Sequence, residues 1–159
     1  MAPYGQPPTA EKATTVSSTS ENLMPRVDEI MKLNEDTLAH RMGIEFTEAS
    51  AARIVATMPV EGNTQPYGLL HGGASVVLAE TLGSIGSALH VGPGRIVVGT
   101  DINATHHRAA RKGLVTGVAT PISLGNTLCS WEIVVSDEDG KRICTSRITC
   151  LVREAPPRA

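Results

Sequence analysis

The order of apolar and polar residues changes its period several times along the chain. In IEFTEASAARIVATMPV, the residues Ile54, Ala56 and Met58 alternate with other side chains, which is the two-residue period of a strand with one buried face. We expect two strand pieces here, separated by a turn near residues 48–51. In the preceding segment MPRVDEIMKLNEDTLAHRMG, the apolar spacing predicts one or two short amphipathic helices that end at Gly43.

The longest apolar stretch is residues 73–89, and it predicts a helix. It contains no proline, and its only charged residue is Glu80. A helix that is apolar on every side is normally buried. At about 1.5 Å per residue it would span roughly 25 Å, enough to cross a small sheet. We therefore expect an antiparallel sheet that curls around this helix and buries it on most sides.

Long strand patterns follow the helix. They are RIVVGTDINATHHRA, GLVTGVATPISLG and TLCSWEIVVSDEDGKRICTSRITCLVR. The last contains DEDGK, with Asp139 and Gly140 at the tip of a hairpin, so it divides into strands at 127–136 and 141–153. The predicted order is strands, one long helix, then four strands in a meander. This order indicates an α+β fold with an antiparallel sheet.

The chain has 159 residues, which suits a single domain. Residues 1–22 are rich in Pro, Ser and Thr and poor in large apolar groups. Burial of such a segment cannot offset the entropy lost on ordering it. We expect a mobile leader at 1–22, a folded domain at 23–154 and a tail at 155–159.

Composition argues against several classes of function. A net charge of -2 gives no global field toward nucleic acid or an anionic membrane, and aromatic residues for stacking on bases are scarce. Three cysteines without C-x-x-C spacing predict neither a disulfide framework nor a zinc site. They favour a reducing compartment, and the opening residues do not resemble a secretory signal, so we expect a cytoplasmic protein. The acid inside the apolar helix weakens a membrane-spanning interpretation.

Glu80 is the residue that the apolar pattern isolates. Other residues at helical spacing on the same face are Gly73, Val77, Ser84 and Ser87. That face is small and partly polar, so a slot or an interface can form along it. Glu80 can simply point to solvent, since Glu is almost never fully buried. Alternatively, it lines a pocket and serves as a nucleophile or a general base.

The start of the same helix offers a second chemical feature. The sequence HGG places Gly72 and Gly73 there, where free backbone N–H groups attract developing negative charge. The absence of a side chain also lets a ligand approach the backbone closely. Taken alone, the two glycines are better explained as turn residues. Their combination with Glu80 is what favours a reactive site.

The segment QPYGLLHGGASVVLAETLGSIGS resembles the active-site segment of hotdog-fold acyl-CoA thioesterases of the PaaI-like group. Within that group it resembles 4-hydroxybenzoyl-CoA thioesterase of the Glu-dependent type and 1,4-dihydroxy-2-naphthoyl-CoA thioesterase. INATHHRAARKG and ISLGNT are also similar to the group's strand and loop patterns, so the resemblance covers roughly residues 36–153. It implies a hotdog fold, in which an antiparallel sheet wraps around one long central helix.

The resemblance implies a role for each candidate residue. Glu80 stands where the catalytic carboxylate stands, and the Gly72 N–H matches the donor to the oxyanion. Gln65 matches a side chain near the thioester carbonyl or the water, and His71 matches a helix-start histidine that supports the site. Ser84 matches a Ser or Thr that orients water or polar substrate groups, and an indirect supporting role is equally defensible.

The resemblance also implies contacts to coenzyme A. The candidates are Arg108, Arg111, Lys112, Asn126 and Thr127. The first three belong to the basic cluster HHRAARK, and Arg is suited to bidentate contacts with phosphate. A plainer interpretation is that this cluster is a solvated strand end. Its two adjacent histidines are poor metal ligands, because neighbours on a strand point to opposite faces.

The expected function is hydrolysis of an acyl-CoA thioester with an aromatic acyl group of the hydroxybenzoyl or hydroxynaphthoyl kind. No metal or redox cofactor is needed, and coenzyme A enters as part of the small-molecule substrate. Gly72 and Glu80 are about 12 Å apart along one helix, so one helix cannot present both to one carbonyl. Two antiparallel copies can, which predicts a homodimer with a shared site. The resemblance implies that such dimers pair into homotetramers.

Two other functions stay open at this point. The same fold serves hydratases and dehydratases of acyl thioesters, but these pair a His with an acid at spacings unlike that between His71 and Glu80. The third possibility is a non-catalytic module that binds acyl-CoA. The presence of Gln65, His71, Gly72 and Glu80 argues against it.

Overall fold

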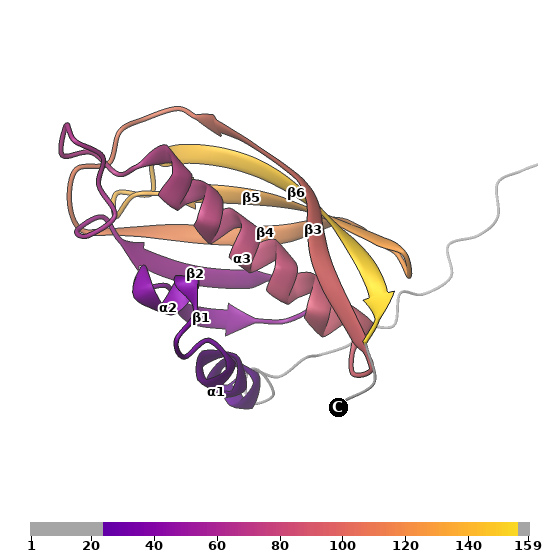
Figure 1. Cartoon of the computed structure of the whole chain (residues 1–159). Helices are drawn as coiled ribbons and strands as arrows, with labels where there is room; N and C mark the ends of the chain where they lie inside the picture. Colours follow the sequence, from indigo (N-terminus) through magenta and orange to yellow (C-terminus); the bar gives the residue numbers. More distant parts are fainter. Residues whose placement is uncertain (1–23, 156–159) are drawn as a thin grey trace, which may run out of the picture.

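The computed structural model describes residues 24–155, and the expected leader at 1–22 lies outside this range. Two short helices precede one long helix, and the strands form a single sheet (Figure 1). The elements are α1 (Met24–Leu33), α2 (Leu38–Arg41), β1 (Glu45–Ala49), β2 (Ile54–Pro59), α3 (Gly72–Val91), β3 (Arg95–His106), β4 (Leu114–Leu124), β5 (Leu128–Ser136) and β6 (Arg142–Glu154).

The predicted turns are confirmed. Gly43 follows α2 with a φ of 70°, a left-handed conformation that glycine adopts without strain. Ser50 and Arg53 close the turn between β1 and β2 through a pair of backbone hydrogen bonds. Gly140, with a φ of 75°, lies in the hairpin that joins β5 to β6. In β2, side chains alternate between buried and half-buried, as the two-residue period predicts.

The place of β3 corrects the predicted topology. The six strands lie in the order β1-β2-β4-β5-β6-β3, and every neighbouring pair is antiparallel. Of the strands that the structure describes, only β4, β5 and β6 form a meander. β3 pairs with β6 instead of β4, with Ile102 opposite Ile148, so the expected four-strand meander is wrong. Alternation along a strand indicates its two faces, but it does not indicate its neighbours.

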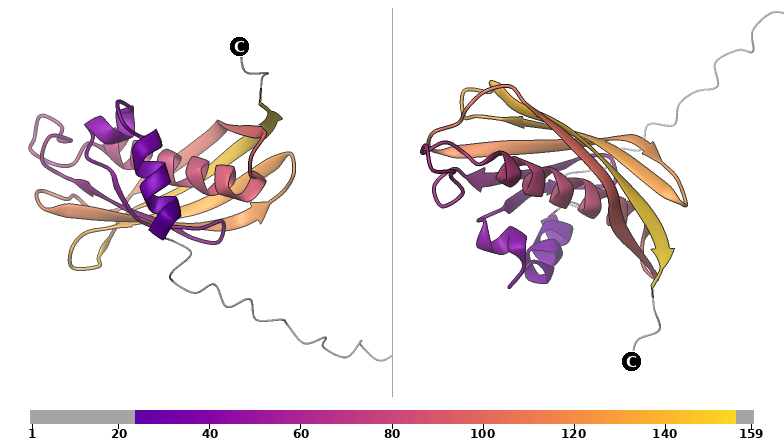
Figure 2. Two further views of the ribbon diagram at one scale, coloured as in Figure 1. Left: turned by 90° about the horizontal axis from the view of Figure 1, so that it is seen from below. Right: turned by 45° about the horizontal axis from the view of Figure 1, so that its top comes forward.

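The helix α3 crosses the concave side of the sheet, and the strands curve around one side of it (Figures 1 and 2). His71 caps its start, and Gly92, with a φ of 73°, follows its end. Of its 20 residues, eight are buried. The expectation of burial on most sides is therefore wrong, because the sheet covers one side and leaves the other open. By length and composition α3 could cross a membrane, but here it is the core helix.

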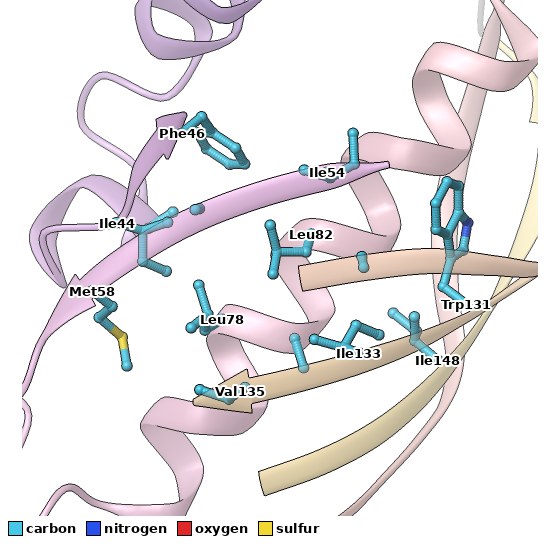
Figure 3. Packing of buried hydrophobic residues seen from close by; sticks show 14 of the residues in the cluster. Ile44, Phe46, Ile54, Met58, Leu78, Leu82, Trp131, Ile133, Val135 and Ile148 are labelled. Carbon is cyan, nitrogen blue, oxygen red and sulfur yellow. The ribbon is translucent and has the colours of Figure 1, made fainter. Parts of the chain in front are cut away.

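The core between α3 and the sheet is aliphatic apart from a few larger side chains (Figure 3). Trp131 is fully buried, and its Nε1–H donates to the Ser87 Oγ at 2.9 Å. Gly86 leaves the space for this indole, because an added Cβ there would lie 2.5 Å from the Trp131 ring. Ser87 thus belongs to the core rather than to the open face on which helical spacing placed it.

β3 is an edge strand that runs along α3. Most of its residues are exposed, and of the described strands only β6 pairs with it. A β-bulge interrupts the pairing between Gly99 and Asp101. Gly72 and Glu80 on α3 both lie beside β3, Gly72 next to His106 and Glu80 next to Gly99.

Candidate active site

The loop before α3 is held to the body of the domain by Asn63. Its Nδ2 donates to the carbonyl oxygens of Met42 and Pro59 at 2.8 and 2.9 Å. Its own carbonyl accepts from the N–H of His71 at 2.9 Å. Asn63 therefore fixes where the chain enters the helix. The sequence does not indicate this role, because nothing near Asn63 points to a partner 21 residues away.

Gln65 lies in this loop and is half-buried. Its Oε1 accepts a hydrogen bond from the Tyr67 backbone N–H at 3.0 Å. Because this bond occupies the oxygen, the Nε2 group is the end of the amide that remains to donate to a ligand. The local turn thus orients the side chain as a donor next to the start of α3.

The first turn of α3 leaves one backbone donor available. The Gly73 N–H donates to His71 Nδ1 at 2.8 Å, and the Ala74 N–H donates to the His71 carbonyl at 2.9 Å. Within residues 24–155, the Gly72 N–H has no acceptor. His71 Nδ1 must be unprotonated to accept, so the neutral ring carries its proton on Nε2. The available N–H is the one that the resemblance implies as the oxyanion donor.

A recess of about 390 Å³ opens beside this turn. Its walls include Gln65, Gly72, Ser75, His106 and Arg108. The His106 ring lies over Gly72, since a Cβ added to Gly72 would be 2.9 Å from His106 Nε2. The sequence placed His106 only in the basic cluster. Its contact with the helix start depends on how β3 runs along α3, which sequence spacing does not show.

Glu80 lies two turns further along α3, on its open side. It is exposed, and it also lines a second recess of about 190 Å³ with β3 residues and Ile148. An added Cβ at Gly99 would be 3.1 Å from Glu80 Oε1, so the carboxylate lies against the β3 backbone. The two interpretations of Glu80 therefore both hold within one chain: it is exposed, and it lines a recess.

Ser84, one turn beyond Glu80, faces the sheet. Its Oγ lies 3.9 Å from Cys150 Sγ on β6. Burial raises the pKa of the Cys150 thiol, and the charge of Glu80 is a smaller contribution in the same direction. The thiol therefore stays protonated at neutral pH. This contact turns the Ser84 hydroxyl toward β6, which favours a supporting role over direct contact with substrate.

The two recesses are separate in one chain and share none of their lining residues. Eight residues divide Gly72 from Glu80, which corresponds to about 12 Å along the helix axis. A carbonyl bond is only about 1.2 Å long. A single chain therefore does not bring the Gly72 donor and the Glu80 carboxylate to one substrate carbonyl.

The predicted contacts to coenzyme A are also divided. Arg108 lines the larger recess, and Arg111 and Lys112 follow it toward β4. Asn126 and Thr127 lie in the turn at the other end of β4, an 11-residue strand about 36 Å long. All five residues are exposed. One chain does not gather them at a single nucleotide.

Comparison with known proteins decides the family. The sequence profile described as Thioesterase superfamily matches residues 67–144. The chain is 52% identical over 117 residues to the proofreading thioesterase EntH of Cronobacter turicensis, which covers 73% of this chain and 85% of the relative. The chain belongs to the thioesterase superfamily. This thioesterase is also 51% identical over 116 residues to EntH of Klebsiella pneumoniae, covering 72% of this chain and 85% of the relative.

Solved structures agree with the family. A thioesterase from Haemophilus influenzae superposes with a TM-score of 0.78 at 43% identity, covering 80% of this chain and 90% of that one. A variant of a thioesterase from Pseudomonas aeruginosa also gives a TM-score of 0.78, at 40% identity, covering 81% of this chain and 94% of that one. The α+β hotdog fold and the enzyme class, a thioester hydrolase, are confirmed. These relatives favour hydrolysis over the hydratase and the binding module.

Proposed function

We propose that this thioesterase hydrolyses acyl-CoA thioesters with an aromatic acyl group, using Glu80 and the Gly72 N–H. The observation that carries the proposal is the pairing of two groups on one helix. The Gly72 N–H is the donor of the first turn without an acceptor in the described chain, and Glu80 is the carboxylate on the open side. The first can stabilise an oxyanion, and the second can attack or activate water.

The reaction converts a thioester and water into a carboxylic acid and the thiol of coenzyme A. In one route, Glu80 attacks the carbonyl carbon, the thiolate leaves, and water hydrolyses the resulting anhydride. In the other, Glu80 removes a proton from water, the hydroxide forms the new C–O bond, and the C–S bond then breaks, so that the thiolate leaves and takes up the proton. In both routes the carbonyl oxygen gains negative charge, and the Gly72 N–H donates to it. The Gln65 Nε2 is a second donor near that oxygen.

The site is shared between two chains in this proposal. The 12 Å that separates Gly72 from Glu80 requires it, since about 1.2 Å separates the carbon and oxygen on which they act. Two antiparallel copies of α3, with their open sides together, place Glu80 of one chain near Gln65, His71 and Gly72 of the other. Dimers then pair into tetramers, which can bring the divided coenzyme A contacts together.

An aromatic acyl group is supported by two observations. The HGG segment with Glu80 resembles the aroyl-CoA branch of the family. The recess beside Glu80 also has apolar walls from Ile102 and Ile148.

The proposed location is the cytoplasm. The three cysteines are free and buried, which suits the reducing conditions of the cytoplasm.

A substrate screen tests the activity. Release of thiol is followed for aroyl-, phenylacetyl-, hydroxynaphthoyl- and fatty acyl-CoA thioesters at equal concentration. We expect the highest kcat/KM for an aroyl or hydroxynaphthoyl thioester. A clear preference for fatty acyl-CoA would overturn the aromatic assignment, and loss of an enoyl-CoA absorbance without thiol release would indicate hydration instead.

Complementation tests the shared site. Glu80→Ala and Gly72→Pro chains are each shown to fold and dimerise, then unfolded together and refolded as a mixture. Proline at the first helical position removes the N–H and is compatible with the start of a helix. A mixed dimer has one site with both groups intact, so part of the activity should return. Verified mixed dimers that stay inactive would contradict the shared site.

A further inference from the structure

Gly99 of β3 is a glycine whose backbone does not require one. It is absent from the residues with positive φ, and it lies in a strand, opposite Cys150 of β6. Glycine weakens a strand interior, because it adds conformational entropy to the unfolded chain and gives no side chain to pack. The absence of a side chain at this position therefore has another cause.

The neighbouring atoms identify that cause. A Cβ added to Gly99 would lie 3.1 Å from Glu80 Oε1, 3.7 Å from an Ile148 methyl group and 3.8 Å from Glu80 Cδ. The nearest group is thus the carboxylate. Gly117 of β4 is a useful contrast, because a Cβ there would lie 2.6 Å from a Leu82 methyl carbon in the core. Gly117 makes room for a buried leucine, and Gly99 makes room for the Glu80 carboxylate.

The backbone around Gly99 is held in place. Gly99 pairs with Cys150 and Asp101 pairs with Thr149, so Thr100 is the extra residue of the bulge. The Thr100 Oγ1 donates to the Thr149 carbonyl at 3.0 Å, which ties the bulge to β6. Glu80, in contrast, is exposed at the end of a flexible side chain. If atoms were added at Gly99, the carboxylate would move before the strand did.

We propose that Gly99 is a positioning residue, and that its missing side chain lets the Glu80 carboxylate lie against β3 in the orientation that hydrolysis requires. The inference rests on the proposed role of Glu80. Gly99 acts through Glu80 and takes no part in bond making. Because the backbone of Gly99 tolerates alanine, the effect of substitution falls on the position of the carboxylate and not on the fold.

The test compares Gly99→Ala with Gly117→Ala in the full chain. A misplacement of about 1 Å can cost about 10²-fold in rate, so a smaller shift in Gly99→Ala should lower kcat roughly tenfold, with KM nearly unchanged. Its melting temperature should be equal to or above that of the unmodified protein. Gly117→Ala should show the reverse, with a lower melting temperature and an unchanged kcat under conditions where it is folded. A kcat for Gly99→Ala within about twofold of normal would overturn the proposal.

A second comparison shows whether Gly99→Ala lowers kcat through Glu80 or through some other disturbance of β3. In Glu80→Asp the side chain is one methylene shorter than that of Glu80, so its carboxylate lies further from the methyl group that Gly99→Ala adds. Gly99→Ala should therefore cost much less in a Glu80→Asp background than in the unmodified chain. An equal fold-loss in both backgrounds would show that Gly99 does not act through Glu80.

Glu80→Ala, measured in parallel, distinguishes failure of the proposed function from failure of the inference about Gly99. Near-normal turnover in this variant removes Glu80 from the mechanism, and the inference about Gly99 falls with it. Loss of turnover in Glu80→Ala together with normal turnover in Gly99→Ala overturns the inference alone and leaves the proposed function standing.

Discussion

The two sides of α3 differ in what their residues contact. On the sheet side, Leu78 and Leu82 are fully buried, and Gly86 fits closely against Trp131. On the open side, Glu80 is exposed, and the Gly72 N–H has no acceptor in residues 24–155. One helix thus carries its stabilising contacts on one side and its candidate chemistry on the other. Substitutions on the two sides should have separable effects on stability and on turnover.

The largest effect should come from the open side. Glu80→Ala removes the proposed base or nucleophile and should lower kcat by about 10³-fold, within the range for such groups. Its melting temperature should stay close to normal, since the side chain is exposed. Thiol release and thermal unfolding measure the two quantities. Glu132→Ala, an exposed acid on β5, is the matched control and should retain full turnover.

The sheet side should show the opposite result. Leu82 is fully buried, so Leu82→Ala should lower the free energy of unfolding by about 2–5 kcal/mol. Its kcat at low temperature should stay near normal. Leu128→Ala makes the same change at a half-exposed position and should cost no more than about 0.5 kcal/mol. Denaturant titration checks both. A selective loss of kcat in folded Leu82→Ala would show that the two sides of α3 are coupled.

Gln65→Ala should have an intermediate effect on turnover. Loss of one positioned donor near an oxyanion costs about 10²-fold in kcat. Ser84→Ala should cost less, because its hydroxyl faces Cys150. Steady-state kinetics on both variants rank the roles. If either variant were as inactive as Glu80→Ala, that residue would have to take part in the chemical step itself.

The smallest effect should come from the basic cluster. Replacing Arg108, Arg111 and Lys112 with neutral residues should raise KM for acyl-CoA several-fold and flatten its dependence on salt, with kcat retained. The measurement is KM at two ionic strengths. Neutralising Lys32 of α1, which is exposed, should leave KM unchanged. Equal KM values at low salt for the triple variant and the unmodified protein would mean that the cluster is only a solvated strand end.

Local features of the fold were predictable from the sequence because they depend on local patterns. The helix expected at 73–89 is Gly72–Val91, since its apolar residues and the following glycine mark both ends. The position of β3 was not predictable, because its partner β6 comes 36 residues after it ends. Ser87 was misplaced for a related reason: helical spacing cannot show that a buried indole N–H needs an acceptor.

In the candidate site, too, some residues were predictable from a local motif and others depend on contacts between distant segments. Gln65, His71, Gly72 and Glu80 were predicted from the motif. The structure places Gln65 and Gly72 at one recess and Glu80 at another, and His71 caps the helix beside the first. Asn63 and Gly99 make their contacts between distant segments, and no sequence pattern indicated them. His106 stood out only as part of the basic cluster, and its contact with Gly72 was not predictable. Asn126 and Thr127 lie far from the basic cluster within one chain, so their proposed role depends on the assembly.

Within residues 24–155, one edge of β3 has no partner strand, and this has a consequence for solubility. β3 is 12 residues long, and Ile96 and Val98 are 40% and 43% exposed on it. A long apolar edge strand is a template for aggregation unless another segment covers it. If a second copy covers this edge, the assembly that completes the site also protects the chain from aggregation. An edge-disrupting substitution such as Val98→Pro would then reduce turnover and solubility together.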